Sequence, residues 1–256
     1  MTDQPLKVWR DRDGKLLRLR LARPKANIID AAMIAALAQA LDDNLSDPRL
    51  VAAMLDHEGP HFSFGASVQE HLPDQCAAML KGFDALLLRL VGAPIPVLVA
   101  VRGQCLGGGM EVAIGGTQIF AAPDAKFGQP EIQLAVFAPP ASCLLPEKMP
   151  RAAAEHLLLT GQSIDAAEAH RLGLVHAVSS DPEAAALDYF DKTLAALSPS
   201  SLRFAVRAAR GDLVERLRAK LASVEDLYLT GLMSSHDAVE GLTAFLDKRP
   251  AKWEGR

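Results

Sequence analysis

Cysteine is scarce in this sequence, and the shortage excludes two ways of stabilising a small protein. Cys76, Cys105 and Cys143 are the only cysteines among 256 residues, an odd number without metal-type spacing. Neither a disulfide framework nor a zinc site is therefore expected. Half of the residues are hydrophobic, so a chain of this length can bury a large core without such help.

Long hydrophobic runs, the residue pattern of a secretion signal and an excess of positive charge are also missing. The most apolar stretch, 85–101, is interrupted by Arg89, Pro94 and Pro96, which makes it too broken to span a bilayer. The first ten residues lack the basic-then-apolar order of a secretion signal. A net charge of -4 gives no general attraction to nucleic acid. We therefore expect a cytoplasmic protein that binds neither membranes nor nucleic acid.

Strands and helices alternate through most of the chain. The residue pattern predicts strands at 16–21, 51–55 and 96–101 and helices at 31–45 and 74–91. Asp30 is placed to cap the first of these helices, and Asp165 to cap a later one. Glycine-containing loops are expected at 57–67 and 103–109. This alternation indicates an α/β fold.

The pattern changes near the C-terminus to helices alone. From about residue 198, apolar residues recur at helical spacing, at Leu213, Leu217, Leu221, Val224, Leu227 and Leu232 and then at Ala238, Leu242, Phe245 and Leu246. We place a boundary near residue 196, between an α/β core at 1–196 and a helical region at 197–256. The apolar surface of that region is expected to contact a partner.

Two glycine-rich loops each follow a predicted strand, one around Gly65-Ala66 and the other at Gly107-Gly108-Gly109. Glycine lets backbone N–H groups approach a ligand closely. Two N–H groups aimed at one point would form an oxyanion hole for a carbonyl oxygen. The alternative is that both loops are only tight turns, since they match neither dinucleotide nor P-loop spacing.

Two glutamates accompany the second loop. Glu111 follows it directly, and Glu131 comes twenty residues later in Phe127-Gly128-Gln129-Pro130-Glu131. Two carboxylates at one site can divide acid and base roles when apolar neighbours shift their pKa values. Taken singly, each glutamate is more typical of a surface residue or a helix start.

These motifs together resemble the enoyl-CoA hydratase (crotonase) signature. The segments that carry the resemblance are 103–111 and 125–131, and almost the whole chain follows the order of that family, from Arg23-Pro24-Lys25-Ala26-Asn27 to the C-terminal 245–249. The resemblance implies a spiral of β-β-α units, with the N–H groups of Ala66 and Gly108 holding a thioester oxygen. It further implies that Glu111 and Glu131 position water and transfer protons without a metal or redox cofactor.

Coenzyme A enters such enzymes as part of the substrate. The resemblance implies contacts with the acyl-CoA from Lys25, Ala26, Asn27, Phe64, Ser67, Phe137 and Lys248, with the adenine near the loop 25–27. A solvated helix-end lysine is the alternative for Lys248. Members of the family also form trimers, commonly paired into hexamers, through their C-terminal helices. We therefore expect a homotrimer or homohexamer.

Two departures from the common pattern narrow the expected substrate. Ser67 stands where many relatives have Asp, and the segment 136–146 replaces a Gly-rich loop with prolines. Both segments resemble those of the dienoyl-CoA hydratases, which act on cyclohexa-1,5-diene-1-carbonyl-CoA in anaerobic benzoyl-CoA degradation. Prolines would stiffen this loop, and Phe137 with Val136 would form an apolar wall for a flat ring. The alternative is that the loop packs only against the core.

The reaction implied is a 1,4-addition of water. Water attacks the carbon β to the thioester, the dienolate oxygen sits in the oxyanion hole, and a proton reaches the far end of the dienolate. The product is 6-hydroxycyclohex-1-ene-1-carbonyl-CoA. The sequence does not assign which glutamate activates water, so the pair is the unit of prediction.

Two other functions compete with this reading. One is a general enoyl-CoA hydratase for short linear or cyclohex-1-ene-1-carbonyl substrates. The other is a non-catalytic binding protein on the same scaffold, which the intact glutamates and the acidic balance disfavour. His57, His61 and His71 lie near the first glycine loop without a paired acid, so a structural or solvent-facing role is expected for them. Ser142 and Cys143 lack the context of a nucleophile.

Overall fold

The computed structural model describes residues 4–256. The first three residues of the segment considered for a secretion signal lie outside that range. Within residues 4–256, no helix combines the length and the apolar character that a membrane crossing requires.

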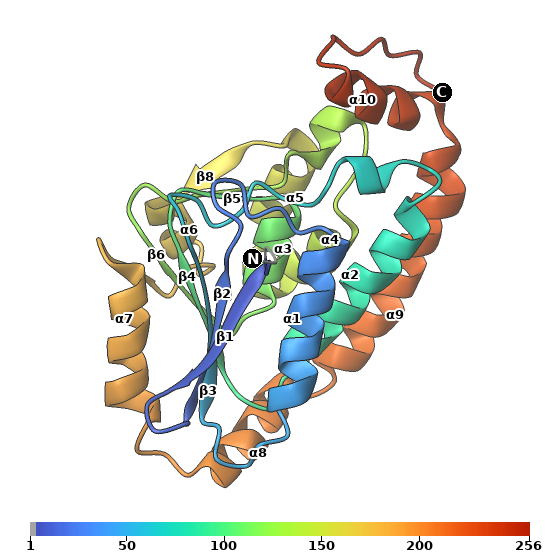
Figure 1. Cartoon of the computed structure of the whole chain (residues 1–256). Helices are drawn as coiled ribbons and strands as arrows, with labels where there is room; N and C mark the ends of the chain where they lie inside the picture. The colour runs from blue at the N-terminus through green and yellow to red at the C-terminus, as the bar shows by residue number, and fades with distance from the viewer. Residues whose placement is uncertain (1–3) are drawn as a thin grey trace.

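A six-stranded sheet runs through the middle of the molecule (Figure 1). Its strand order is β1 (Leu6–Asp11), β2 (Leu16–Leu21), β3 (Ala52–His57), β4 (Val97–Val101), β6 (Gln118–Ala121) and β9 (Ala177–Val178). Only β1 runs antiparallel to its neighbour, and the other neighbouring strands are parallel. The predicted strands at 16–21, 51–55 and 96–101 are confirmed, whereas β1 was not anticipated because its residues are half polar.

A second sheet of three short strands lies beside the first. It consists of β5 (Gln104–Leu106), β7 (Lys126–Gly128) and β8 (Ser163–Asp165). The prediction of an uninterrupted loop at 103–109 was therefore wrong, because residues 104–106 pair in parallel with β7. Successive units send one strand to each sheet and then form a helix, as β4, β5 and α3 (Gly108–Ile114) do. These β-β-α units form the predicted spiral.

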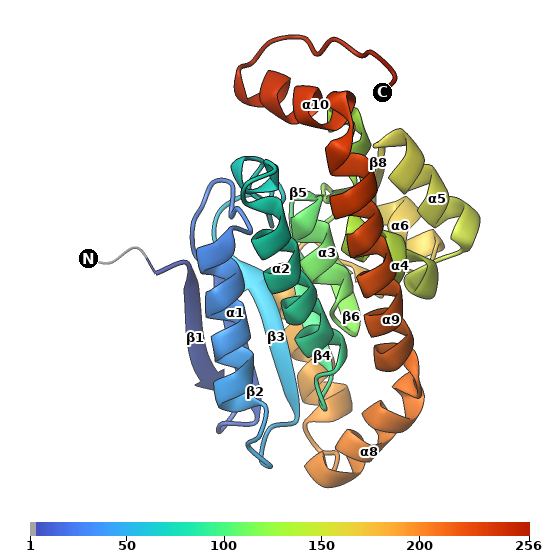
Figure 2. The ribbon, with the colours of Figure 1, turned by 90° about the vertical axis from the view of Figure 1, so that its right-hand side faces the viewer.

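Helices cover both faces of the large sheet. Figure 2 shows α1 (Ala31–Asn44), α2 (Cys76–Val91) and α9 (Leu213–Asp226) side by side on one face. Alternate residues of β2 point to opposite faces of the sheet. Leu17 and Leu19 belong to the core under these helices, whereas Leu16 belongs to the core on the other face. The other face packs against α7 (Pro182–Tyr189) and the turn η3 (Phe190–Leu194).

Local capping signals set several helix ends as predicted. Asp30 accepts a hydrogen bond from the N–H of Met33 at the start of α1, and Asp165 accepts one from Glu168 at the start of α6 (Ala166–Arg171). The remaining helices and helical turns are η1 (Gln69–His71), η2 (Pro130–Leu134), α4 (Pro139–Lys148), α5 (Arg151–Thr160), α8 (Pro199–Arg210), η4 (Leu227–Gly231), η5 (Leu232–Ser234) and α10 (His236–Leu246).

The expectation of a proline-stiffened loop at 136–146 was wrong over most of that segment. Pro139 and Pro140 are the first two residues of α4. A proline is well tolerated in the first turn of a helix, where its missing N–H would have no intrahelical partner. The two prolines therefore start a helix, and only residues 135–138 connect it to η2.

Candidate active site

Glu111 stands in the first turn of α3, directly beyond the end of β5. The chain turns there at Gly107, whose φ of +49° is rarely adopted by residues with a side chain. A Cβ at this position would lie 2.5 Å from Oε1 of Glu131. Gly107 thus provides both the turn into α3 and the space that the Glu131 carboxyl group occupies.

The Glu111 side chain is almost completely buried. Glu111 is 5% exposed, and its Oε1 accepts a hydrogen bond from the N–H of Ala141 at 2.8 Å. Burial raises the pKa of Glu111 well above its ordinary value, and the nearby Glu131 raises it further, against the opposing effect of the Ala141 N–H. At neutral pH, these surroundings favour the protonated form of Glu111.

Glu131 enters the site from η2, just after β7. Burial raises its pKa to about 7. The neighbouring Gln129 is 1% exposed, and with its amide nitrogen turned toward the carboxylate it donates to Oε1 and Oε2 at 3.2 and 3.1 Å. Two buried carboxylates that line the same cavity do not readily both ionise, so the pair keeps at least one proton near neutral pH.

Two backbone N–H groups lie beside the glutamates. Within residues 4–256, neither Ala66 nor Gly108 donates its N–H to a protein acceptor. The two positions adjoin, because a Cβ on Gly108 would lie 3.0 Å from the nitrogen of Ala66. The chain enters Ala66 through Gly65, at a φ of +115°, and the Gly65 carbonyl is held by the Ile29 N–H at 2.9 Å. The geometry suits an oxyanion hole.

Two small adjoining cavities meet at this point. One, of about 70 Å³, is lined by residues in and near the two glycine loops, η1, η2 and α10: Phe64, Gly65, Ala66, Val68, His71, Gly107, Pro130, Glu131, Leu134, Val136 and Leu242. The other, of about 10 Å³, reaches deeper and is bordered by both glutamates, Gly108 and Phe137. Ala66, His71 and Glu131 line both cavities.

Several of the predicted binding residues border these cavities and several do not. Phe64 and Val136 line the larger cavity and Phe137 the deeper one. Phe137 is backed by Tyr228, with ring centroids 5.2 Å apart and the rings nearly perpendicular. Ser67 is absent from both linings. Val136 and Phe137 therefore border the cavities in which the apolar wall was expected.

The loop 25–27 lies outside the cavities but is tied to their rim. Ala26 accepts a hydrogen bond from the N–H of Phe64 at 2.9 Å. Asn27 is fully buried, and its Nδ2 donates to the carbonyls of Glu58 and His61, each at 3.0 Å. Its side chain therefore shapes the loop. Lys25 and Lys248 are exposed and line neither cavity.

His71 was expected to have a structural or solvent-facing role, yet it borders both cavities. It ends the turn η1, and its Nδ1 lies 2.8 Å from the carbonyl oxygen of Ser67. Gln129 and Leu242 were also missed as site residues. The position of Gln129 between Gly128 and Glu131 was a usable signal, whereas nothing local in the sequence brings α10 to this cavity.

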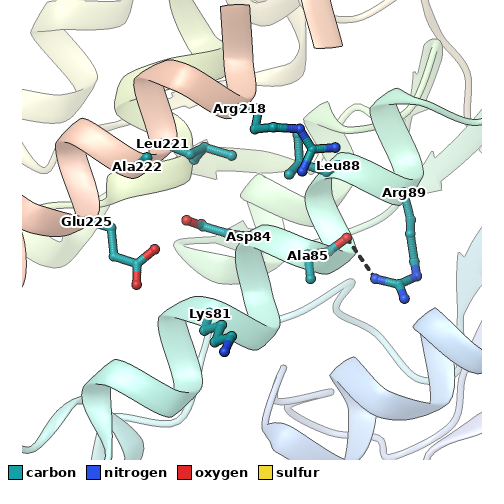
Figure 3. Close-up of a pocket in the computed structure, with 9 residues that line it drawn as sticks. All are labelled: Lys81, Asp84, Ala85, Leu88, Arg89, Arg218, Leu221, Ala222 and Glu225. Carbon is teal, nitrogen blue, oxygen red and sulfur yellow. Dashed lines mark hydrogen bonds between the residues drawn. The ribbon is translucent and has the colours of Figure 1, made fainter. Parts of the chain in front are cut away.

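A separate cavity of about 410 Å³ opens between α2 and α9 (Figure 3). The Asp84 carboxyl points across it toward Glu225, and Arg218 lies on the same wall of α9. Asp84 is 7% exposed, and burial followed by the charge of Glu225 raises its pKa to about 7. The described residues that line this cavity all belong to α2 and α9 and include no glycine loop, so the arrangement at Glu111 and Glu131 is the better candidate for chemistry.

Comparisons with known proteins agree with the resemblance noted in the sequence. The family model described as enoyl-CoA hydratase/isomerase matches residues 11–256. The cyclohexa-1,5-dienecarbonyl-CoA hydratase of Thauera aromatica is 66% identical over 252 residues, which cover 98% of both chains. The carnitinyl-CoA dehydratase of Salmonella agona is 32% identical over 255 residues, covering 96% of this chain and 97% of the relative.

Solved structures share the fold over nearly the whole chain. An enoyl-CoA hydratase from Mycobacterium avium superposes with a TM-score of 0.87 at 27% identity, covering 98% of this chain and all of its own. An enoyl-CoA hydratase/isomerase from Pseudoalteromonas atlantica gives a TM-score of 0.85 at 26% identity, covering 97% and 99%.

Proposed function

Because this chain belongs to the enoyl-CoA hydratase/isomerase family, we propose that it adds water to a cyclic conjugated dienoyl-CoA, cyclohexa-1,5-diene-1-carbonyl-CoA. The observation that carries this substrate is the 66% identity, over almost the full length, to a hydratase named for it. The apolar wall of Val136 and Phe137 beside the glutamates is compatible with a flat, nonpolar ring.

The thioester oxygen binds between the N–H groups of Ala66 and Gly108. Both groups are free of protein acceptors among residues 4–256 and adjoin each other, which supports this role. As water attacks the ring, negative charge moves onto this oxygen. Two fixed donors in a dry site stabilise that charge by a few kcal/mol each, about 100-fold or more in rate per donor.

Glu111 and Glu131 act as one acid/base pair. In the form of the pair that holds a single proton, one carboxylate accepts a proton from water and one carboxylic acid gives a proton to the substrate. The hydroxide oxygen bonds to the carbon β to the thioester, and the π electrons move to form the dienolate. The acid then protonates the far carbon of the dienolate, so the net change is the addition of one water.

Coenzyme A reaches the site past Phe64, with its nucleotide near the loop 25–27. Phe64 is 44% exposed and also lines the larger cavity, so it lies where an acyl chain would enter. The hydrogen bond from Phe64 to Ala26 supports placing that loop at the rim. Lys248 and Lys25 supply exposed positive charge for phosphates.

The helical region 197–256 serves assembly into a trimer or hexamer. Several large apolar side chains of this region are exposed in the single chain, namely Leu197, Phe204, Leu227, Phe245, Leu246 and Trp253. Exposed apolar groups of this size are typical of an interface. Sedimentation of the purified protein tests the proposal, and a species with the mass of one chain at micromolar concentration would contradict it.

The test of function is turnover in oxygen-18 water. We expect label in a hydrated product from cyclohexa-1,5-diene-1-carbonyl-CoA, with far slower reaction of crotonyl-CoA and cyclohex-1-ene-1-carbonyl-CoA. E111Q and E131Q should each lower the rate at least about 100-fold. E147Q, which changes an exposed carboxylate of α4 paired with Arg216, is the matched control. Preferred turnover of crotonyl-CoA would overturn the ring assignment, and undiminished activity in both glutamine variants would overturn the pair.

A further inference from the structure

The hydrogen-bond geometry of His71 fixes which of its ring nitrogens carries the hydrogen. Nδ1 lies 2.8 Å from the carbonyl oxygen of Ser67. A carbonyl oxygen can only accept, so Nδ1 is the donor. In the neutral imidazole the other nitrogen, Nε2, then has a free lone pair and acts as an acceptor.

His71 remains in this neutral form in the site. Burial lowers its pKa, against the opposing effect of the Ser67 carbonyl. The charged or titratable groups that share the cavities with it are Glu111 from α3 and Glu131 from η2. Among the described residues that line the two cavities, none is a lysine or an arginine, so no cation competes for Nε2.

The acceptor nitrogen is available to a small molecule in the site. Within residues 4–256, Nε2 of His71 makes no hydrogen bond to the protein. Since this nitrogen has no partner among the described residues and is not completely shielded, water can reach it. His71 lines both cavities together with Glu131 and Ala66, so its ring borders the space where the acyl group and water would meet.

A 1,4-addition across a six-membered ring creates a need for such an acceptor. The carbon that receives hydroxide and the carbon that receives the proton lie opposite each other in the ring. In a simple hydration the two carbons are adjacent, so two carboxyl groups can bracket the same water. When one carboxyl serves the far carbon, the water keeps a single carboxylate partner, and its second hydrogen needs another acceptor.

We propose that His71 is a further catalytic residue, whose Nε2 accepts one hydrogen of the attacking water while its other hydrogen faces the carboxylate that removes it. The inference rests on the proposed dienoyl-CoA hydration. Ser67 contributes through its carbonyl group, which holds the imidazole in the required tautomer. His71 itself gains and loses no proton in the step, so the proton balance of the glutamate pair is unchanged.

Two substitutions separate the two ring nitrogens. In H71N, the amide nitrogen can replace Nδ1 as the donor to Ser67, but nothing replaces Nε2. In H71Q, the longer side chain carries an amide oxygen to the neighbourhood of Nε2. With cyclohexa-1,5-diene-1-carbonyl-CoA, we expect kcat of H71N to be about 100-fold lower than that of the unsubstituted protein, and KM to change by less than about threefold. We expect kcat of H71Q to lie within about tenfold of the unsubstituted value.

His156 provides the matched control, because it is exposed on α5 and lines neither cavity. H156N should keep the full kcat. Unchanged kcat in H71N, or equal losses in H71N and H71Q with unchanged melting temperatures, would overturn the role of Nε2. If H71N does not fold, H71Q decides alone: kcat within tenfold supports the role, and a 100-fold loss at a native melting temperature refutes it. A protein with all residues intact that fails to hydrate the diene would instead refute the proposed function.

Discussion

Replacing Asp84 by Asn should stabilise this protein at neutral pH, and the gain should be much smaller in mild acid. Asp84 lies in the cavity between α2 and α9, 7% exposed, and its Oδ1 has no hydrogen-bond partner within residues 4–256. An ionised carboxylate in that position is costly because it has left water and faces Glu225 (Figure 3). Asn fills the same space and cannot ionise.

The magnitude follows from the displacement of the Asp84 pKa. Burial and Glu225 raise it from 3.8 to about 7 in the folded chain. The unfolded chain therefore ionises first, and the free energy of unfolding falls as pH rises between these two values. At 1.36 kcal/mol per pKa unit, the total loss is roughly 4 kcal/mol, of which about 2 kcal/mol falls between pH 5 and pH 7.

Urea unfolding at several pH values from 5 to 8.5 measures this effect. The quantity of interest is the free energy of unfolding of D84N minus that of the unsubstituted protein, at one fixed protein concentration because association shifts apparent stability. We expect this difference to grow with pH up to about 7 and then level off. D124N, at an exposed turn, should show no such rise. A flat difference curve for D84N would refute the reasoning.

Three further substitutions test the geometry of the active site. G108A places a Cβ in the gap between the two N–H groups, so kcat should fall about 100-fold in steady-state assays, while an unchanged rate would argue against the hole. Q129L removes the donors to Glu131, so the pKa of the glutamate pair should rise and the acidic limb of the kcat profile should move to higher pH; an unmoved limb would contradict this contact. F137A should raise KM about tenfold for the cyclic diene and leave KM for crotonyl-CoA nearly unchanged, and equal effects on both substrates would show that Phe137 does not contact the ring.

Much of the fold could be predicted because its signals are local. The alternation of Leu17 and Leu19 with Arg18 and Arg20 marks β2, and Asp30 marks the start of α1. The error at 136–146 also has a local cause. Prolines are typical both of stiff loops and of the first turn of a helix, and only the packing of α4 decides between them.

The active site could be predicted only in part, because its contacts are not local. The family motifs indicated Glu111, Glu131, Ala66 and Gly108, and the structure brings these residues together. The position of His71 depends on the turn η1 and on the bond to Ser67, which no spacing of histidines with acids reveals. Pairing with an acid does not mark His71, since the partner of its Nδ1 is a backbone carbonyl.

The twenty-residue separation of the two glutamates shows why strand pairing matters for this chemistry. Glu111 comes five residues after the end of β5, and Glu131 comes three residues after the end of β7. These strands are parallel neighbours, and the N–H of Gly107 donates to the carbonyl of Gly128 at 2.9 Å where they end. Residues 104–106, which were expected to belong to a glycine-rich loop, thus form the strand whose pairing helps to set the distance between the carboxyl groups. A change that loosens β5 from β7 should therefore reduce turnover before it unfolds the large sheet.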